Sequence, residues 1–267
     1  MAERLDARLV RVGIASGREK AKQLIASGAV TVNGKVVTKA ACSVEEFDRV
    51  ESSAPPPRYV GRGGEKLEKA IKIASLSLQG AVAMDIGAST GGFTDCMLQN
   101  GAAHVYAVDV GHGQLHPSLR ADARVTCLEG TDCRNTQLLM ETVAAESISF
   151  CSVDVSFISL QAVLPSLSPF LAKEATVVCL IKPQFEAGKR AVGKKGVVKD
   201  KRDHMRVINE QLALFASLGY TVNTLTYSPI VGGEGNIEYL AVLSKGASSK
   251  AIVQAAFVVE EAFRALK

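Results

Sequence analysis

The sequence predicts two domains: a small α+β domain at the N-terminus and an α/β domain built on a mostly parallel sheet. Positive charge gathers at the start of the chain, because residues 1–40 hold eight Lys/Arg and three Asp/Glu although the whole chain has a net charge of only +4. Consecutive prolines at 55–57 can form neither a helix nor a central strand. After them, apolar β-type segments alternate with helical ones, the pattern of a parallel sheet covered by helices.

The N-terminal segment predicts two helices followed by a hairpin. Apolar side chains recur at helical spacing over residues 4–12. Residues 16–19, with the sequence SGRE, fit a capping box of Ser16 and Glu19, so a second helix should begin there and end before Gly28. The dipeptide Asn33-Gly34 separates two β-branched runs and readily adopts two positive φ angles, which favours a tight hairpin.

We place the domain boundary in the stiff run SSAPPP, which gives an N-terminal domain of residues 1–57 and a second domain of residues 58–267. The last two β-type runs, 220–228 and 237–243, follow each other without a helix, so we expect an antiparallel hairpin at one sheet edge. The other predicted strands are 81–86, 103–108, 148–153 and 175–181, and the predicted helices lie near 65–75, 92–100, 159–171 and 201–217.

The composition is that of a globular protein, with 47% hydrophobic and 22% charged residues. No apolar run approaches the ~18 residues of a membrane span, and the first residues lack the apolar stretch of a secretory signal, so we expect a cytoplasmic protein without a membrane partner. The six cysteines form no C-x-x-C pair, and Gly113 and Pro117 make a helix that would align His112 with His116 unfavourable. We therefore expect neither disulfides nor a metal site.

Residues 81–93, AVAMDIGASTGGF, combine a buried strand ending in Asp with a glycine turn and a helix. Small residues there let a ligand approach the backbone at the carboxyl edge of the sheet. A nicotinamide fingerprint would need Gly where Ser89 stands, and a Walker loop would need G-K-[ST]. The pentapeptide GASTG also satisfies the G-x-S-x-G of α/β-hydrolases, but His204, alone in the second half of the chain, lies in a charged helical stretch. A loop for S-adenosylmethionine explains more than these alternatives.

In that interpretation the methionine portion of the donor lies against Asp85 and the glycines. Asp109 ends the second strand, where a carboxylate can accept hydrogen bonds from ribose hydroxyls. Thr131 and Asp132 follow the third apolar run and should lie near the adenine. The predicted cofactor-binding residues are Asp85, Gly87, Ala88, Ser89, Thr90, Gly91, Gly92, Asp109, Thr131 and Asp132.

Six motifs, in order over nearly the whole chain, resemble the TlyA family of ribosomal RNA methyltransferases, whose catalytic domain is similar to the FtsJ-like 2′-O-methyltransferases. They are RGGEKL (62–67), DIGASTGGFT (85–94), DVGHGQL (109–115), DVSFISL (154–160), KPQFE (182–186) and GNIEY (235–239). The resemblance implies a Rossmann-like S-adenosylmethionine methyltransferase sheet behind an αL-type RNA-binding domain. It also implies methylation of a cytidine ribose in 23S rRNA, and in some members of a second in 16S rRNA. The short N-terminus favours the single target.

The resemblance carries the family's catalytic set over to Lys66, Asp154, Lys182 and Glu238. Asp154 and Lys182 also follow buried runs, which places them at strand carboxyl ends beside the cofactor crevice. A ribose hydroxyl is a weak acid, so it needs an oriented acceptor beside positive charge. We expect Lys182 to orient the hydroxyl and, if neutral, to accept its proton; the four charges could instead chiefly fix geometry. Without the motifs, Lys66 would be interpreted as a solvated helix lysine and Glu238 as an edge-strand charge.

We expect ribosomal RNA or a ribosomal subunit as the partner of a monomeric protein. The predicted RNA-binding residues are Arg4, Arg8, Arg11, Arg18, Lys20, Lys22, Arg58 and Arg62. Because no aromatic residue precedes Phe47, the first domain should recognise backbone shape. Residues 58–64 should reorient when RNA binds, and the basic loop 188–196 should clamp the target strand.

The sequence leaves two other functions to consider. A ribosome-assembly factor that binds RNA without catalysis would not need the intact glycine loop and four charged positions. Membrane lysis is the second alternative, because members of the family have been called hemolysins. No segment of the sequence, however, is long and apolar enough to insert into a membrane.

Overall fold

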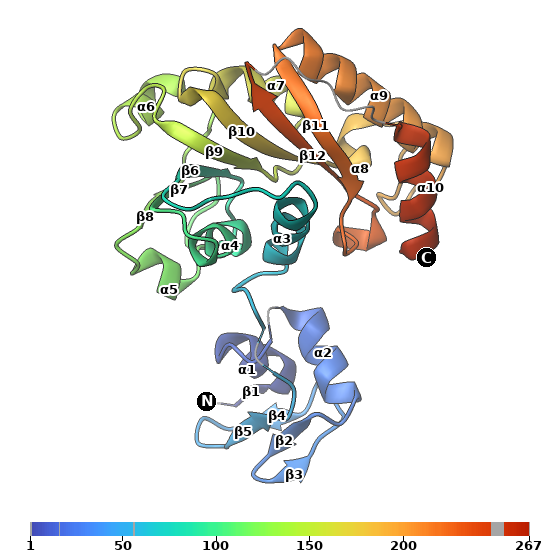
Figure 1. Cartoon of the computed structure of the whole chain (residues 1–267). Helices are drawn as coiled ribbons and strands as arrows, with labels where there is room; N and C mark the ends of the chain where they lie inside the picture. The colour runs from blue at the N-terminus through green and yellow to red at the C-terminus, as the bar shows by residue number, and fades with distance from the viewer. Residues whose placement is uncertain (1, 16, 56, 247–253, 267) are drawn as a thin grey trace. The chain divides into compact units, whose positions relative to one another are not determined.

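The computed structural model describes residues 2–15, 17–55, 57–246 and 254–266. Two compact units make up the chain, residues 1–62 and residues 63–267, and their elements are labelled in Figure 1. The prolines predict the boundary a few residues earlier, after residue 57. Pro56, like Ser16 of the predicted capping box, lies outside the described residues.

The first unit contains the two predicted helices and the predicted hairpin. Asn33 and Gly34 have φ angles of 52° and 77°, as the tight turn requires. Three further short strands, β1, β4 and β5, were not predicted from the sequence. β1 pairs with β4, and β5 joins the predicted hairpin in a three-stranded sheet of order β3-β2-β5. The elements are β1 (Glu3–Arg4), α1 (Leu5–Arg11), α2 (Arg18–Ala26), β2 (Val30–Val32), β3 (Lys35–Val36), β4 (Ser43–Val44) and β5 (Val50–Ser52).

A buried carboxylate joins the two helices of this unit. Asp6 in α1 is fully buried and accepts hydrogen bonds from Arg4, at 3.1 Å, and from Arg18 of α2, at 3.0 Å. The bonds from Arg4, reinforced by Arg18, lower the pKa of Asp6 to about 2. Leu5, Leu9, Ala21, Ile25, Val30 and Val44 form most of the small core around it.

A seven-stranded sheet of order β11-β12-β10-β9-β6-β7-β8 forms the centre of the second unit. Strands β10, β9, β6, β7 and β8 are parallel neighbours, so their carboxyl ends share one edge. This confirms the predicted, mostly parallel α/β sheet. The strands are β6 (Val82–Ile86), β7 (His104–Asp109), β8 (Val125–Glu129), β9 (Ile148–Val153), β10 (Leu171–Ile181), β11 (Tyr220–Tyr227) and β12 (Tyr239–Lys245).

The predicted C-terminal hairpin is confirmed, because β11 and β12 pair antiparallel. The hairpin stands at one edge of the sheet, as predicted, with β11 outermost, and β12 lies between β11 and β10 and pairs antiparallel with β10. Residues 239–243 are all buried, which an edge strand with one solvated side would not be. Ile181 pairs with Tyr239 in the register of these two strands. Lys182, the residue after β10, therefore lies next to Glu238, the residue before β12, in the continued register.

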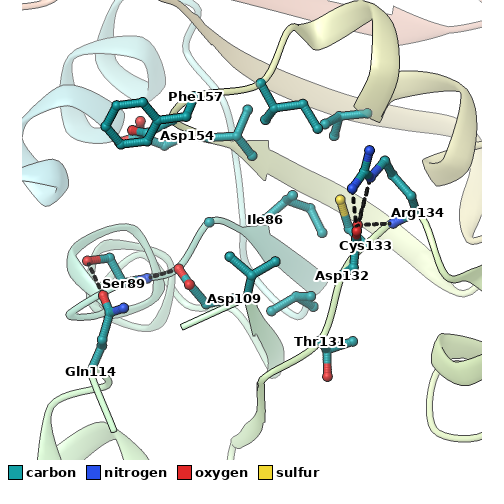
Figure 2. A pocket seen from close by; sticks show the side chains of 17 residues that line it. Ile86, Ser89, Asp109, Gln114, Thr131, Asp132, Cys133, Arg134, Asp154 and Phe157 are labelled. Carbon is teal, nitrogen blue, oxygen red and sulfur yellow. Dashed lines mark hydrogen bonds and ion pairs between the residues drawn. The ribbon is translucent and has the colours of Figure 1, made fainter. Parts of the chain in front are cut away.

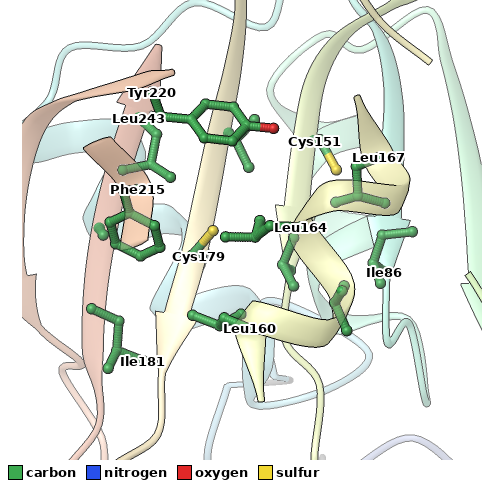
Figure 3. Packing of buried hydrophobic residues seen from close by; sticks show 14 of the residues in the cluster. Ile86, Cys151, Leu160, Leu164, Leu167, Cys179, Ile181, Phe215, Tyr220 and Leu243 are labelled. Carbon is green, nitrogen blue, oxygen red and sulfur yellow. The ribbon is translucent and has the colours of Figure 1, made fainter. Parts of the chain in front are cut away.

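Several helices pack against the sheet and against one another. Leu160, Val163, Leu164 and Leu167 of α7 are buried against strand residues that include Cys151 and Cys179, and Phe215 of α9 joins the same cluster (Figure 3). Helices α3 and α4 contact each other, and α9 contacts α10 (Figure 1). The helices are α3 (Gly63–Ile73), α4 (Gly92–Gln99), α5 (Pro117–Arg120), α6 (Thr136–Met140), α7 (Leu160–Leu167), α8 (Pro183–Glu186), α9 (Lys201–Ser217) and α10 (Ala255–Ala265), with a 3₁₀ turn η1 (Gly233–Gly235).

Of the helices that the structure describes, none is long and apolar enough to pass through a membrane.

Replacing Leu164 by Ala should destabilise the second unit by about 2–5 kcal/mol, because the truncated side chain leaves a cavity in a close-packed cluster. Leu138, which is 43% exposed, is the matched control, and Leu138→Ala should change the free energy of unfolding by about 0.5 kcal/mol or less. Urea unfolding measures both. Equal destabilisation by the two variants would contradict the packing described here.

Candidate active site

The four predicted catalytic residues meet at the carboxyl edge of the sheet. Lys66 lies in α3, whereas Asp154, Lys182 and Glu238 stand directly after β9, directly after β10 and directly before β12. Lys66 Nζ is 2.7 Å from a Glu238 oxygen and 3.8 Å from an Asp154 oxygen. Lys182 Nζ is 2.6 Å from the other Asp154 oxygen. Charges of opposite sign therefore alternate through the cluster.

Burial makes this alternation necessary. Lys66 and Lys182 are each 8% exposed and Glu238 is 2% exposed. A charge removed from water is tolerated only when it is paired, and here two ammonium groups offset two carboxylates. Lys66 is therefore not a solvated helix lysine, nor is Glu238 an exposed charge on a sheet edge.

Two further polar residues, not predicted as site residues, hold the cluster. Lys182 donates a hydrogen bond of 2.9 Å to Ser156 Oγ. Gln184 Nε2 donates a hydrogen bond of 3.2 Å to Glu238 Oε1. Both residues fall inside the motifs DVSFISL and KPQFE, which was the only signal for them. Gly232 leaves room for the carboxylate, because a Cβ there would lie 2.2 Å from Glu238 Oε1.

A cavity of about 630 Å³ adjoins the charged cluster (Figure 2). Asp154 and Ser156 line it, so the cavity and the cluster are continuous. Figure 2 shows Asp154 and Phe157 on the side of the cavity opposite Thr131. The remaining lining residues come mainly from the ends of β6 and β7 and from the segments after β8 and β9. This is the crevice where open α/β sheets bind ligands.

The glycine turn forms part of the cavity wall. Gly87 has a φ of +83°, and a Cβ there would lie 2.4 Å from the backbone oxygen of Asp154. Ser89 adopts a positive φ of 49°, which is uncommon for a residue with a side chain. Its backbone N–H donates a 2.8 Å hydrogen bond to Asp109. The turn is thus fixed between the active-site loop and the end of β7.

Carboxylates at two neighbouring strand ends hold the backbone beside the glycine turn. Asp109 accepts hydrogen bonds from the backbone of Ser89 and of Gly111, the latter at 2.7 Å. Glu129, its partner on β8 in the sheet register, accepts bonds from the backbone N–H groups of residues 113–115. The bond from Leu115, together with the one from Arg120, lowers the pKa of Glu129 to about 2. Glu129 was not predicted, although its position at a strand end matches that of Asp109.

The structure places only some of the predicted cofactor residues in the cavity wall. The residues that line it are Gly87, Ser89, Asp109, Thr131 and Asp132. Ala88, Thr90, Gly91 and Gly92 belong to the turn and the start of α4 without being among the described lining residues.

Asp85 lies below the turn rather than in the cavity wall. It is fully buried and accepts hydrogen bonds from Thr94 Oγ1 at 2.7 Å and from Ser152 Oγ at 2.8 Å. Burial raises the pKa of Asp85 to about 6, although both hydroxyl bonds oppose the shift. In this structure the carboxyl group joins β6 to α4 and β9 and so supports the turn from inside.

The predicted RNA-binding residues differ in exposure. Lys20, Lys22, Arg58 and Arg62 are exposed, and the side chains of Arg4, Arg11 and Arg18 are about half-exposed although each pairs with a carboxylate. Arg8 is buried: it contacts Glu3 and donates to the backbone oxygens of Glu45 and Glu46. Its guanidinium therefore holds the turn before β5.

Two family models match the chain. The model described as FtsJ-like methyltransferase matches residues 59–245, and the model described as S4 domain matches residues 3–50. The chain belongs to the FtsJ-like methyltransferase family and carries an S4 domain at its N-terminus.

Relatives match almost the whole chain. A Bacillus subtilis protein named as a candidate rRNA methyltransferase, YqxC, is 43% identical over 99% of this chain and 95% of its own length. The 16S/23S rRNA (cytidine-2′-O)-methyltransferase TlyA of Mycobacterium tuberculosis is 40% identical over 88% of this chain and 87% of its own. A solved structure from Streptococcus thermophilus, named as a candidate hemolysin, is 41% identical with a TM-score of 0.79, and covers 99% of this chain and 96% of its own. The resemblance to the TlyA family is confirmed.

The buried Asp85 should make stability depend on pH. Because its folded pKa of about 6 exceeds the ordinary 3.8, the folded state keeps the proton over a range in which the unfolded state has lost it. The carboxyl group therefore costs stability as pH rises from about 4 to above 6, by up to about 3 kcal/mol. Asp85→Asn lacks this cost, so its stability relative to the unaltered protein should increase over that interval. Urea unfolding at pH 4, 5, 6 and 7 measures the difference, and a constant difference would contradict the assignment.

Proposed function

We propose that this protein transfers a methyl group from S-adenosylmethionine to the 2′-hydroxyl of a cytidine ribose in ribosomal RNA. The observation that carries the proposal is the cluster of paired charges formed by Lys66, Asp154, Lys182 and Glu238, which adjoins the cavity beside the glycine turn through Asp154. The family provides the reaction class, and the names of relatives such as the Mycobacterium tuberculosis enzyme provide the nucleotide and the kind of RNA.

The residues of the cavity fit the methyl donor. Gly87 and Ser89 of the glycine turn line the cavity, and because glycine has no side chain the donor can lie close to the backbone of the turn. Asp109 retains lone pairs beyond its two backbone bonds and is suited to accept hydrogen bonds from ribose hydroxyls. Thr131 and Asp132 line the far side, where an adenine would lie. When bound, the donor supplies an electrophilic methyl group on a sulfonium centre.

Lys182 is suited to act on the ribose hydroxyl. An ammonium group has three N–H donors, of which one is donated to Ser156 Oγ, and the charge of the group is paired with Asp154 at 2.6 Å. A remaining donor can hold the oxygen of the hydroxyl in line for attack and stabilise the negative charge that grows on it. In its neutral form the same amine can accept the proton. Lys66 fixes the two carboxylates, and Asp154 fixes Lys182, so the cluster positions one reactive group.

The S4 domain and a basic loop are suited to bind the RNA backbone. Lys20 and Lys22 are exposed and, with the half-exposed Arg4, Arg11 and Arg18, can contact phosphates. Arg8 contributes through the fold of the domain. The loop of residues 188–196 follows Lys182 closely, and its four basic side chains are exposed, so it can hold the strand that carries the target nucleotide. Such a protein would act on ribosomes or their precursors in the cytoplasm.

Lys182→Ala should lower methyl transfer by roughly 10²–10⁴-fold, because the hydroxyl loses its orienting and charge-stabilising group. Lys173→Ala is the matched control: Lys173 is exposed on the same strand, near the opposite edge of the sheet, and its loss should leave transfer unchanged. Transfer of labelled methyl groups to subunits from a strain lacking the enzyme measures both, and mapping shows the modified atom. Label on a base, or full transfer by Lys182→Ala, would refute the proposal. An assembly factor without catalysis would transfer no label at all.

Lys20→Gln should weaken RNA binding and reduce the slope of log affinity against log salt by about one, because one phosphate contact is lost. Lys173→Gln should leave the slope as it is. Binding to the ribosomal subunit at several salt concentrations measures both slopes. An unchanged slope for Lys20→Gln would show that Lys20 does not contact an RNA phosphate.

A further inference from the structure

We propose that Gln184 makes the enzyme prefer cytosine over uracil at the target nucleotide, by accepting a hydrogen bond from the exocyclic amino group of the base. This inference rests on the proposed function and names how that site selects its substrate. Three observations lead to it: a second cavity, a locked amide and an unpaired oxygen.

A second cavity, of about 490 Å³, lies beside the charged cluster. Phe157 lines both this cavity and the one beside the glycine turn, and Gln184 joins the second cavity to Glu238 of the cluster. The rings of Phe157 and Phe185 form part of its wall, with centroids 4.9 Å apart. Aromatic walls of this kind suit a flat base removed from its stack. Lys189, Gly188 and Val192 complete the lining.

The side-chain amide of Gln184 can point in one direction only. Its nitrogen donates to Glu238 Oε1 at 3.2 Å, and the other oxygen of that carboxylate is paired with Lys66 at 2.7 Å. A flipped amide would set its oxygen against the carboxylate oxygen, so repulsion between two acceptors excludes the flip. The cluster that orients the ribose hydroxyl thereby also fixes the orientation of this amide.

The amide oxygen that remains is unpaired. Gln184 Oε1 is shielded from solvent and has no hydrogen-bond partner among the residues that the structure describes. Buried acceptors in native proteins nearly always have a donor, and an exception calls for an explanation, such as a group that a ligand brings. Cytosine offers a donor in its N4 amino group, whereas uracil presents its O4 acceptor at the same place. A locked oxygen attracts the first and repels the second.

Phe157 is the part of the wall best placed to admit the base. Its side chain is 90% exposed, so little packing is lost when it moves. Its φ of +63° is unusual for a bulky residue, and such strain is found most often where a segment has a functional role. Gln184 Oε1 is shielded in this state, so a base reaches it only when neighbouring groups move, and Phe157 is a lining residue that can move at little cost.

The test compares transfer to subunits that carry cytidine or uridine at the mapped target position. Gln184→Met keeps the length of the side chain and removes the acceptor, and Gln161→Met is the matched control on the exposed side of α7. The unaltered protein and Gln161→Met should share one cytidine-to-uridine ratio of kcat/KM. In Gln184→Met this ratio should fall about tenfold or more. A disturbance of Glu238 alone would lower both rates together and leave the ratio intact.

An unchanged ratio in Gln184→Met, with transfer still detectable, would overturn the role of Gln184 while leaving the proposed function in place. Failure of the unaltered protein to label any ribose would overturn the proposed function and this inference with it. The two failures are distinguished by the unaltered protein alone.

Discussion

The mutual pairing of four charges, three of them buried, is the interaction on which the rest of the site depends. Removing an ammonium or a carboxylate group from water costs free energy unless a group of opposite charge accompanies it. Each of the four therefore needs the element that brings its partner: α3 for Lys66, and the ends of β9, β10 and β12 for the others. The antiparallel insertion of β12 beside β10 is decisive, since it sets the segment after Ile181 against the segment before Tyr239.

The sequence was sufficient to predict the position of a site residue where that position depends only on its place along one strand. Asp154 and Lys182 follow buried runs, and the parallel sheet brings such residues to one edge whatever the details of packing. The hairpin at Asn33 and Gly34 was predictable for a similar reason, because the backbone angles it needs favour few residue types.

The sequence was not sufficient to predict the role of a side chain whose hydrogen-bond partners are distant along the chain. Asp85 lies one residue before the end of β6, whereas Asp109 ends β7, and the carboxyl group of Asp85 is hydrogen-bonded to Thr94 and Ser152 inside the fold. Arg8 belongs to a basic run, but the backbone oxygens that bind it lie more than thirty residues away in the chain. The place of β12 inside the sheet also depends on tertiary pairing, which an alternating pattern of apolar residues does not encode.

The contact between Gly87 and the backbone of Asp154 means that the donor cavity and the charged cluster have a common wall. Any shift of the turn must press on the loop that carries Asp154, the partner of Lys182, and any shift of that loop must press on the turn. In the proposed reaction, the affinity for the methyl donor and the rate of methyl transfer are consequently coupled properties.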